Sequence, residues 1–151
     1  MLIQTKYFGE VEYKETDILS FPEGLFGFEE EHQFLLLPFA GSDATLLCLQ
    51  SLNTSALAFV VMNPFSLKPD YAPILQAEEL QSLSVTQSED LCYYVLCVVR
   101  QPVSQSTVNL KCPIVVNDEA RVCMQVILEM SEYEMRHPLS EFGTRGADCE
   151  C

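Results

Sequence analysis

Lysine and arginine are scarce in this chain of 151 residues: eight of them stand against 22 aspartates and glutamates, and the net charge is −14. Nucleic-acid binding depends on a basic surface that neutralises phosphates, so we expect no direct nucleic-acid partner. Long apolar runs are missing too, and none reaches the length that spans a membrane. The N-terminus turns polar by Gln4, so we expect neither a secretory signal nor a membrane partner.

Motifs that carry chemistry are also missing. No G-x-G-x-x-G, P-loop, G-x-S-x-G or H-E-x-x-H sequence occurs. The two histidines, His32 and His137, lie in polar, loop-like sequence. A cysteine nucleophile with one of them as its base stays open as an alternative, because distance along the chain does not fix distance in space. Cys149 and Cys151 lack the wider paired spacing of zinc ligands. We therefore expect no catalytic site, no metal and no cofactor.

A disulfide framework is not indicated, because the seven cysteines are odd in number and show no paired spacing. Five of them lie in apolar, strand-like runs: Cys48, Cys92, Cys97, Cys112 and Cys123. We interpret these as reduced core cysteines of a cytosolic protein. The acidity favours a basic protein as partner, since opposite charges speed encounter. The alternative is that acidity only maintains solubility.

The strongest pattern that is present lies in residues 107–130, TVNLKCPIVVNDEARVCMQVILEM. Apolar residues recur at a spacing of two in both halves, which predicts two strands of a hairpin rather than a helix. The polar break Asn117–Ala120 predicts the turn. Pro113 cannot donate to a strand ladder, so we expect it at an edge or a bulge. The alternate positions, including Arg121 and Gln125, are expected to face water or a polar partner.

Similar patterns predict further strands at 2–13 (a hairpin turning at Gly9-Glu10), 18–21, 33–39, 45–52, 56–63 and 91–99. Residues 77–83 are the one convincing helical turn, and 64–71 are predicted to be irregular with Phe65 and Tyr71 near the surface. Many short strands with little helix predict an all-β fold, a small antiparallel β-barrel-like or sandwich domain with one or two short helical turns. We expect this single domain to span 1–142, followed by a disordered tail at 143–151.

The sequence FPEGLFGF at 21–28 combines one proline and two glycines with three phenylalanines. Glycine permits positive φ, and proline fixes its own φ. The combination predicts a tight loop that turns Phe21 and Phe28 inward. The three glutamates that follow, 29–31, are expected to form a solvated, turn-like surface.

An ordered series of short motifs runs along the chain. It comprises Thr5-Lys6-Tyr7-Phe8-Gly9, FPEGLFGF at 21–28, Leu49-Gln50-Ser51, Pro64-Phe65, Pro69-Asp70-Tyr71, Asn109-Leu110, Pro113-Ile114, Asn117 and Gln125-Val126. The series closely resembles the FliW family of flagellar assembly factors over about residues 2 to 142. Each motif alone is weak, and their order makes the resemblance specific.

The resemblance implies a small antiparallel β-barrel-like fold and a non-enzymatic role in the bacterial cytoplasm. Proteins of this family bind flagellin, and they bind the carbon storage regulator CsrA, a basic RNA-binding dimer that blocks translation of flagellin messenger RNA. Accumulated flagellin would occupy the protein and leave CsrA free to repress, and export of flagellin would release the protein to antagonise CsrA. A narrower alternative is a dedicated flagellin chaperone without CsrA regulation. Ala72-Pro73-Ile74 stand where acidic residues are common in the family.

Two groups of residues are singled out for function. For partner contact we expect exposed aromatic and acidic side chains in or near the irregular segment: Phe65, Asp70, Tyr71, Glu78 and Glu79. The residues of the family motif are interpreted as structural, since glycine, proline and buried aromatics mostly serve the backbone and the core: Phe21, Pro22, Gly24, Gly27, Phe28, Gln50, Asn109, Pro113, Asn117 and Gln125. The polar ones among them are expected to satisfy buried backbone groups.

Overall fold

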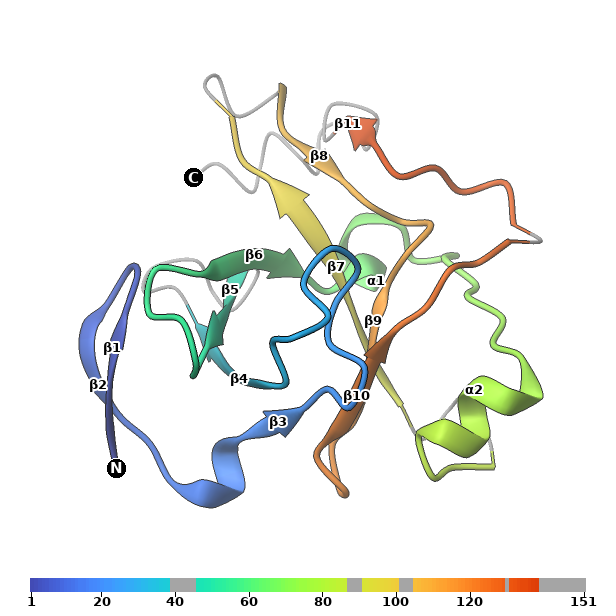
Figure 1. Ribbon diagram of the computed structural model, residues 1–151. Helices are drawn as coiled ribbons and strands as arrows, with labels where there is room; N and C mark the ends of the chain where they lie inside the picture. Colours follow the sequence, from blue (N-terminus) through green and yellow to red (C-terminus); the bar gives the residue numbers. More distant parts are fainter. Residues whose placement is uncertain (39–45, 87–90, 101–104, 130, 139–151) are drawn as a thin grey trace.

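The computed structural model describes residues 1–38, 46–86, 91–100, 105–129 and 131–138 (Figure 1). The predicted tail at 143–151 and the predicted break at 40–43 lie outside these residues. The extent of the single domain, 1–142, therefore stays a prediction. Among the described residues, no helix is long and apolar enough to cross a membrane.

Seven strands close into a barrel. Their order around the ring is β7 (Cys92–Val98), β6 (Ala58–Met62), β5 (Leu46–Ser51), β4 (Gln33–Pro38), β3 (Leu19–Ser20), β10 (Val122–Gln125) and β9 (Ile114–Asn117), and β9 pairs again with β7. All these pairings are antiparallel except the contact of β3 with β10, where Ser20 pairs in parallel with Val122. The predicted all-β, barrel-like class is confirmed, with this parallel contact as the one departure from an antiparallel sheet.

The hairpin predicted at 107–130 forms, but its first strand is interrupted. β8 (Thr107–Val108) pairs with β7 and with β11 (His137–Pro138), and β9 starts six residues later. Pro113 lies in this break, where its missing N–H costs no ladder bond. Asn117 pairs with Val122, so the turn is 118–121, one residue later than predicted, and Arg121 has a φ of +58°. Met130 lies outside the described residues.

Both faces of this hairpin are covered, so the expectation of one wet face is wrong. Val115 is fully buried, and Gln125 is only 6% exposed. Successive side chains alternate between two cores because side chains alternate along a strand. The inner core fills the barrel with Leu19, Phe21, Leu25, Phe34, Leu49, Val61, Ile114, Val116 and Cys123. The outer core includes Val115 and Val126 and lies beneath the short helices α1 (Pro64–Leu67) and α2 (Ala77–Ser82). An apolar spacing of two predicts one buried face of a strand, but it does not show that other segments also cover the opposite face.

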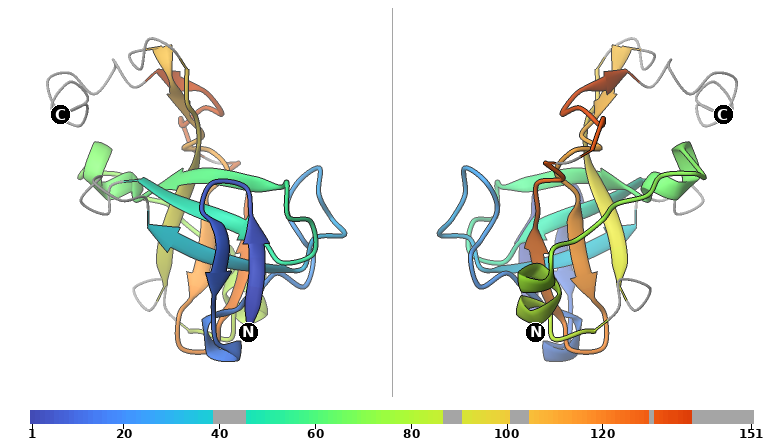
Figure 2. Two further views of the ribbon diagram at one scale, coloured as in Figure 1. Left: turned by 90° about the vertical axis from the view of Figure 1, so that its left-hand side faces the viewer. Right: turned by 90° about the vertical axis from the view of Figure 1, so that its right-hand side faces the viewer.

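The N-terminal hairpin, β1 (Leu2–Thr5) with β2 (Gly9–Glu12), lies against one side of the barrel (Figure 2). Thr5 pairs with Gly9, so the turn is 6–8 and not at Gly9-Glu10 as predicted. A buried side chain of β5 fastens it: the Lys6 amide donates to Gln50 Oε1 at 2.9 Å. The Gln50 Nε2 group in turn donates to the carbonyl of Leu57 at 3.2 Å. A short 3₁₀ helix, Glu15–Asp17, leads from β2 to β3.

Two aromatic side chains lie where the sequence did not place them. Phe28 was expected inside, but it is 40% exposed and packs edge-on against Phe59. Tyr71 was expected at the surface, but it is 4% exposed and donates its hydroxyl to the carbonyl of Leu110 at 2.7 Å. Its segment also begins with α1 rather than being irregular throughout. The helix starts where Asn63 Oδ1 accepts from the Phe65 amide and Pro64 occupies the first position, two start signals that the sequence carries.

Candidate functional site

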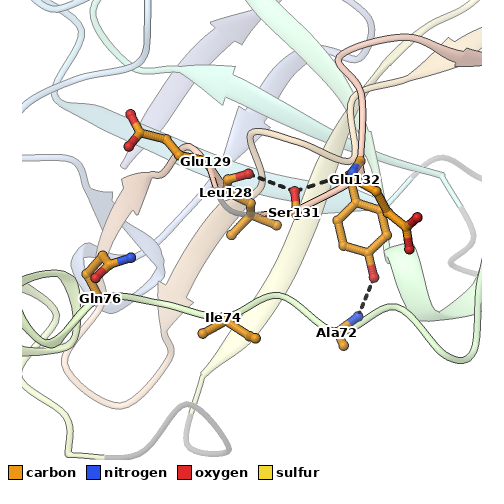
Figure 3. A pocket seen from close by; sticks show the side chains of 8 residues that line it. Ala72, Ile74, Gln76, Leu128, Glu129, Ser131 and Glu132 are labelled. Atoms are coloured by element: carbon orange, nitrogen blue, oxygen red, sulfur yellow. Dashed lines mark hydrogen bonds between the residues drawn. The ribbon is translucent and has the colours of Figure 1, made fainter.

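An open groove of about 830 Å³ runs between α2, the loop 23–29 and the chain that leaves β10. A second hollow of about 410 Å³ adjoins it and shares Gln76 and Glu129 (Figure 3). We call the two together the acidic groove. The extended segment 72–76 forms the wall of the second hollow that lies opposite Leu128 and Glu129, and we call this segment the strap. The lining residues are Glu23, Gly24, Phe26, Glu29, Gln76, Glu78, Glu79, Met124, Gln125, Val126, Ile127 and Glu129, with Ala72, Ile74, Leu128, Ser131, Glu132 and Tyr133 in the second hollow.

The lining carries charge of one sign only. Six of these residues are glutamates, and none is a lysine or an arginine. Two of the carboxylates also brace the backbone: Glu79 Oε1 accepts from the Gln76 amide at 2.7 Å, and Glu29 Oε2 accepts from the Gly27 amide at 3.1 Å. Carboxylates that converge on one open groove attract a cationic partner, and walls of low dielectric strengthen that attraction.

Exposed apolar side chains stand among the carboxylates. Ile74 on the strap is 79% exposed, Phe26 is 47% exposed and Ile127 is 39% exposed. Single exposed apolar residues are ordinary, but three around one groove provide area for a partner to bury. An apolar centre with a charged rim is the usual composition of a protein interface.

Buried amide side chains hold the walls of the groove. The Phe26 amide donates to Gln125 Oε1 at 3.0 Å, and Gln125 Nε2 donates to the carbonyl of Cys112 at 3.2 Å. Asn117 Nδ2 donates to the carbonyl of Leu83 at 2.7 Å, which fixes the end of α2. One amide therefore ties the loop 23–29 to the barrel, and another ties α2 to it. These bonds add to the packing of Leu25 in the inner core and of Leu83 in the outer core.

The strap is held at both of its ends. At one end the Ala72 amide donates to the hydroxyl of Tyr133 at 2.9 Å. The rings of Tyr71 and Tyr133 lie 4.7 Å apart. At the other end, Gln76 is bonded to Glu79 at the start of α2. The strap thus keeps a defined position opposite Leu128 without belonging to a sheet.

Of the residues predicted for partner contact, the structure brings only Glu78 and Glu79 into the groove. Phe65 is 38% exposed but packs edge-on against the rings of Tyr71 and Tyr93. Asp70 is exposed and pairs with Lys68 at 3.2 Å. Tyr71 is buried, so it offers its ring to the outer core and not to a partner. Of the five residues predicted for partner contact, two therefore line the acidic groove, and the other three lie in the segment 65–71 outside it.

The residues of the family motif lie in turns or donate and accept side-chain hydrogen bonds that hold neighbouring backbone segments. Pro22 occupies the second position of a turn closed by the Gly24 amide and the Phe21 carbonyl at 2.9 Å. Asn109 accepts from the Cys112 amide at 3.0 Å and shapes the break before β9. Gln50 and Asn117 bind the backbone of neighbouring segments as described above. Gly27 has a φ of +86°, a conformation that favours glycine.

Sequence reasoning missed the apolar part of the groove and most of its carboxylates. Ile74 carried a signal, because Ala72-Pro73-Ile74 stand where the resemblance leads us to expect acidic residues. Glu29 belongs to the three glutamates that were interpreted as a solvated surface, and Glu23 lies inside the 21–28 motif, where it was given no role. Ile127 and Glu129 are alternate positions of the hairpin, which were expected to face water or a polar partner, but the strand pattern did not indicate that they lie in a groove beside α2.

Potential metal ligands and thiols among the described residues bear on chemistry other than binding. The described residues contain no group of three or more histidine, cysteine or acidic side chains that could hold a metal ion. Four of the five strand cysteines are buried, and the prediction that Cys92 is also a core residue is wrong, because it is exposed. Burial raises the pKa of Cys48 and Cys97 to about 11 and that of Cys123 to about 12. These thiols are protonated at neutral pH and are poor nucleophiles.

Thiol labelling separates Cys92 from the buried cysteines. Partial desolvation and the Asp118 carboxylate raise the pKa of Cys92, so its labelling should be slow at neutral pH and accelerate as the pH rises. We expect Cys92 to react at least about tenfold faster than Cys48, Cys97, Cys112 and Cys123, which need local opening. Mass spectrometry of a variant with Cys149→Ser and Cys151→Ser measures this. Rapid labelling of a buried cysteine at neutral pH would contradict the assignment.

Comparison with known proteins places these features in context. A family profile described as "FliW protein" matches residues 2–139. A "Flagellar assembly factor FliW" from Geobacillus kaustophilus (strain HTA426) is 43% identical over 139 residues, which covers 92% of this chain and 95% of the relative. One from Shouchella clausii (strain KSM-K16) is 38% identical and covers 97% of this chain and 99% of the relative. A crystal structure of the flagellar assembly factor FliW superimposes with a TM-score of 0.86 at 41% identity, covering 92% of this chain and 96% of that one.

Proposed function

The chain belongs to the FliW family of flagellar assembly factors, and from this premise we propose that it is a non-enzymatic partner switch for flagellin and CsrA. In this proposal it binds flagellin in the cytoplasm and also binds and antagonises CsrA, which represses translation of flagellin messenger RNA. Flagellin that accumulates occupies the protein and leaves CsrA free to repress. Flagellin that is exported releases the protein, which then removes CsrA.

The observation that carries the proposal is the acidic groove. Six glutamates without a lysine or arginine suit a basic RNA-binding protein. The exposed side chains of Phe26, Ile74 and Ile127 suit the apolar faces of flagellin's terminal segments, which are unstructured before assembly. One groove with both properties supports two partners whose binding excludes or weakens one another, which is all that a switch of this kind requires.

A chaperone that binds flagellin without regulating CsrA is the second candidate. The strap favours it, because Ala72-Pro73-Ile74 stand where acidic residues are common in the family, and Ile74 is 79% exposed. An apolar strap suits an apolar partner better than a basic one. The remaining glutamates of the groove favour the switch.

Calorimetric titration of the protein with purified flagellin and, separately, with purified CsrA distinguishes these functions. The switch predicts saturable binding to both partners. Binding to flagellin alone supports the chaperone. Binding to neither partner, with all three proteins folded, would contradict both candidates.

A further inference from the structure

Residues 126–129, which follow β10, form backbone hydrogen bonds along one of their two edges. The Val126 amide donates to the carbonyl of Pro113 at 3.1 Å, and the Leu128 amide donates to the carbonyl of Lys111 at 2.8 Å. The side chains of Val126 and Leu128 are 2% and 4% exposed, whereas Ile127 and Glu129 are exposed. This alternation of amides and side chains is that of a β-strand, although only one edge is paired.

The other edge of the same segment is open. Within the described part of the chain, no acceptor meets the amide of Ile127 or Glu129. Because Val126 and Leu128 direct their amides toward 111–113, the amides of Ile127 and Glu129 point away from that partner. Both residues line the acidic groove. We call residues 127–129 the open edge. Unpaired amides in a row are a template for an added strand.

The opposite wall leaves this edge accessible. The strap is bonded at Ala72 and Gln76, its two ends, and Pro73 has no amide to donate. The hollow of about 410 Å³ separates the strap from Leu128 and Glu129 (Figure 3). The strap therefore borders the open edge without pairing with it.

The negative charge around the open edge indicates which kind of segment can bind there. Glu129 and Glu132 border the open edge, Glu78 and Glu79 lie further along the groove, and none of the described residues that line it is a lysine or an arginine. We propose that an extended, basic peptide segment of a partner protein adds as a β-strand to the open edge, with its amides and carbonyls bonded to Ile127 and Glu129 and its basic side chains on the glutamates. This inference rests on the proposed function, in which the basic RNA-binding partner CsrA is the source of the segment.

Amide hydrogen exchange measured residue by residue by NMR tests the inference. In the free protein, the amides of Val126 and Leu128 should be protected and those of Ile127 and Glu129 should exchange fast. At saturation with CsrA, we expect the exchange of Ile127 and Glu129 to slow at least about tenfold. Unchanged exchange at these two positions in a complex that calorimetry shows to be saturated would overturn strand addition and leave the proposed function intact. Absence of any CsrA binding would overturn both.

Two variants separate backbone pairing from side-chain contact. Ile127→Ala removes the side chain and keeps the amide, whereas Ile127→Pro removes both. We expect Ile127→Pro to bind CsrA roughly five to ten times more weakly than Ile127→Ala. Equal affinities, with both variants folded by circular dichroism, would overturn the inference. If the proline variant does not fold, the exchange measurement decides alone.

Discussion

A variant carrying Glu78→Lys and Glu79→Lys is expected to bind CsrA roughly ten to a hundred times more weakly than the unaltered protein. Both residues line the acidic groove, so the change replaces attraction by repulsion where a basic partner would dock. The dependence of affinity on salt should flatten, because fewer opposite charges remain to be screened. Titrations at several salt concentrations measure both effects.

The matched control carries Glu10→Lys and Glu12→Lys on β2, which lies on the opposite side of the barrel (Figure 1). This control raises the net charge by the same amount and should change affinity little. Because Glu79 also accepts from the Gln76 amide, Glu78→Lys alone should retain the helix start and show roughly half the loss of binding free energy. Equal losses in the groove variant and the control would contradict a local role for the groove.

Gly24→Ala is expected to lower the free energy of unfolding by about 3 kcal/mol or more and the melting temperature by about 10 °C. Gly24 has a φ of +69°, and a Cβ there would lie 2.5 Å from the Phe28 carbonyl oxygen and 2.6 Å from the Glu29 Cα. These are backbone atoms, so a side-chain rotation cannot relieve the contact. The loop would have to move, and with it the groove wall that carries Glu23 and Glu29.

Gly27→Ala is the control for the same loop. Gly27 also has a positive φ, +86°, but an added Cβ meets nothing within 4 Å. It should therefore cost only the backbone strain, about 1 kcal/mol. Thermal and chemical unfolding of the two variants measure the difference. If Gly24→Ala were as stable as Gly27→Ala, the close approach at Gly24 would not exist as described.

The strands were largely predictable because alternating apolar residues report directly on pairing. The strands predicted at 33–39, 45–52, 56–63 and 91–99 agree with β4 to β7 within a few residues, and the helical turn at 77–83 agrees with α2. The family resemblance was also visible in the order of short motifs. What local patterns did not contain was the closure of the ring, which depends on one pairing between β7 and β9.

The site was predicted less well, because exposure depends on which segments fold over the barrel. Tyr71 follows two prolines and resembles a surface residue, yet the rings of Phe65 and Tyr133 enclose it. Phe28 belongs to an aromatic motif and resembles a core residue, yet the barrel already contains Phe21 and Phe34. Glu78 and Glu79 were found because a charged helix near an irregular segment is visible locally. Apart from the neighbouring strap, the rest of the groove lining comes from segments more than forty residues away in sequence.

The central claim is that flagellin and CsrA compete for this protein, and displacement measures it most directly. Fluorescently labelled CsrA is first bound to the protein at saturation, and flagellin is then added while anisotropy is recorded. The partner switch predicts that flagellin releases CsrA and that the apparent affinity for flagellin falls as CsrA is raised. A ternary complex in which each partner binds as tightly as it does alone would contradict the claim.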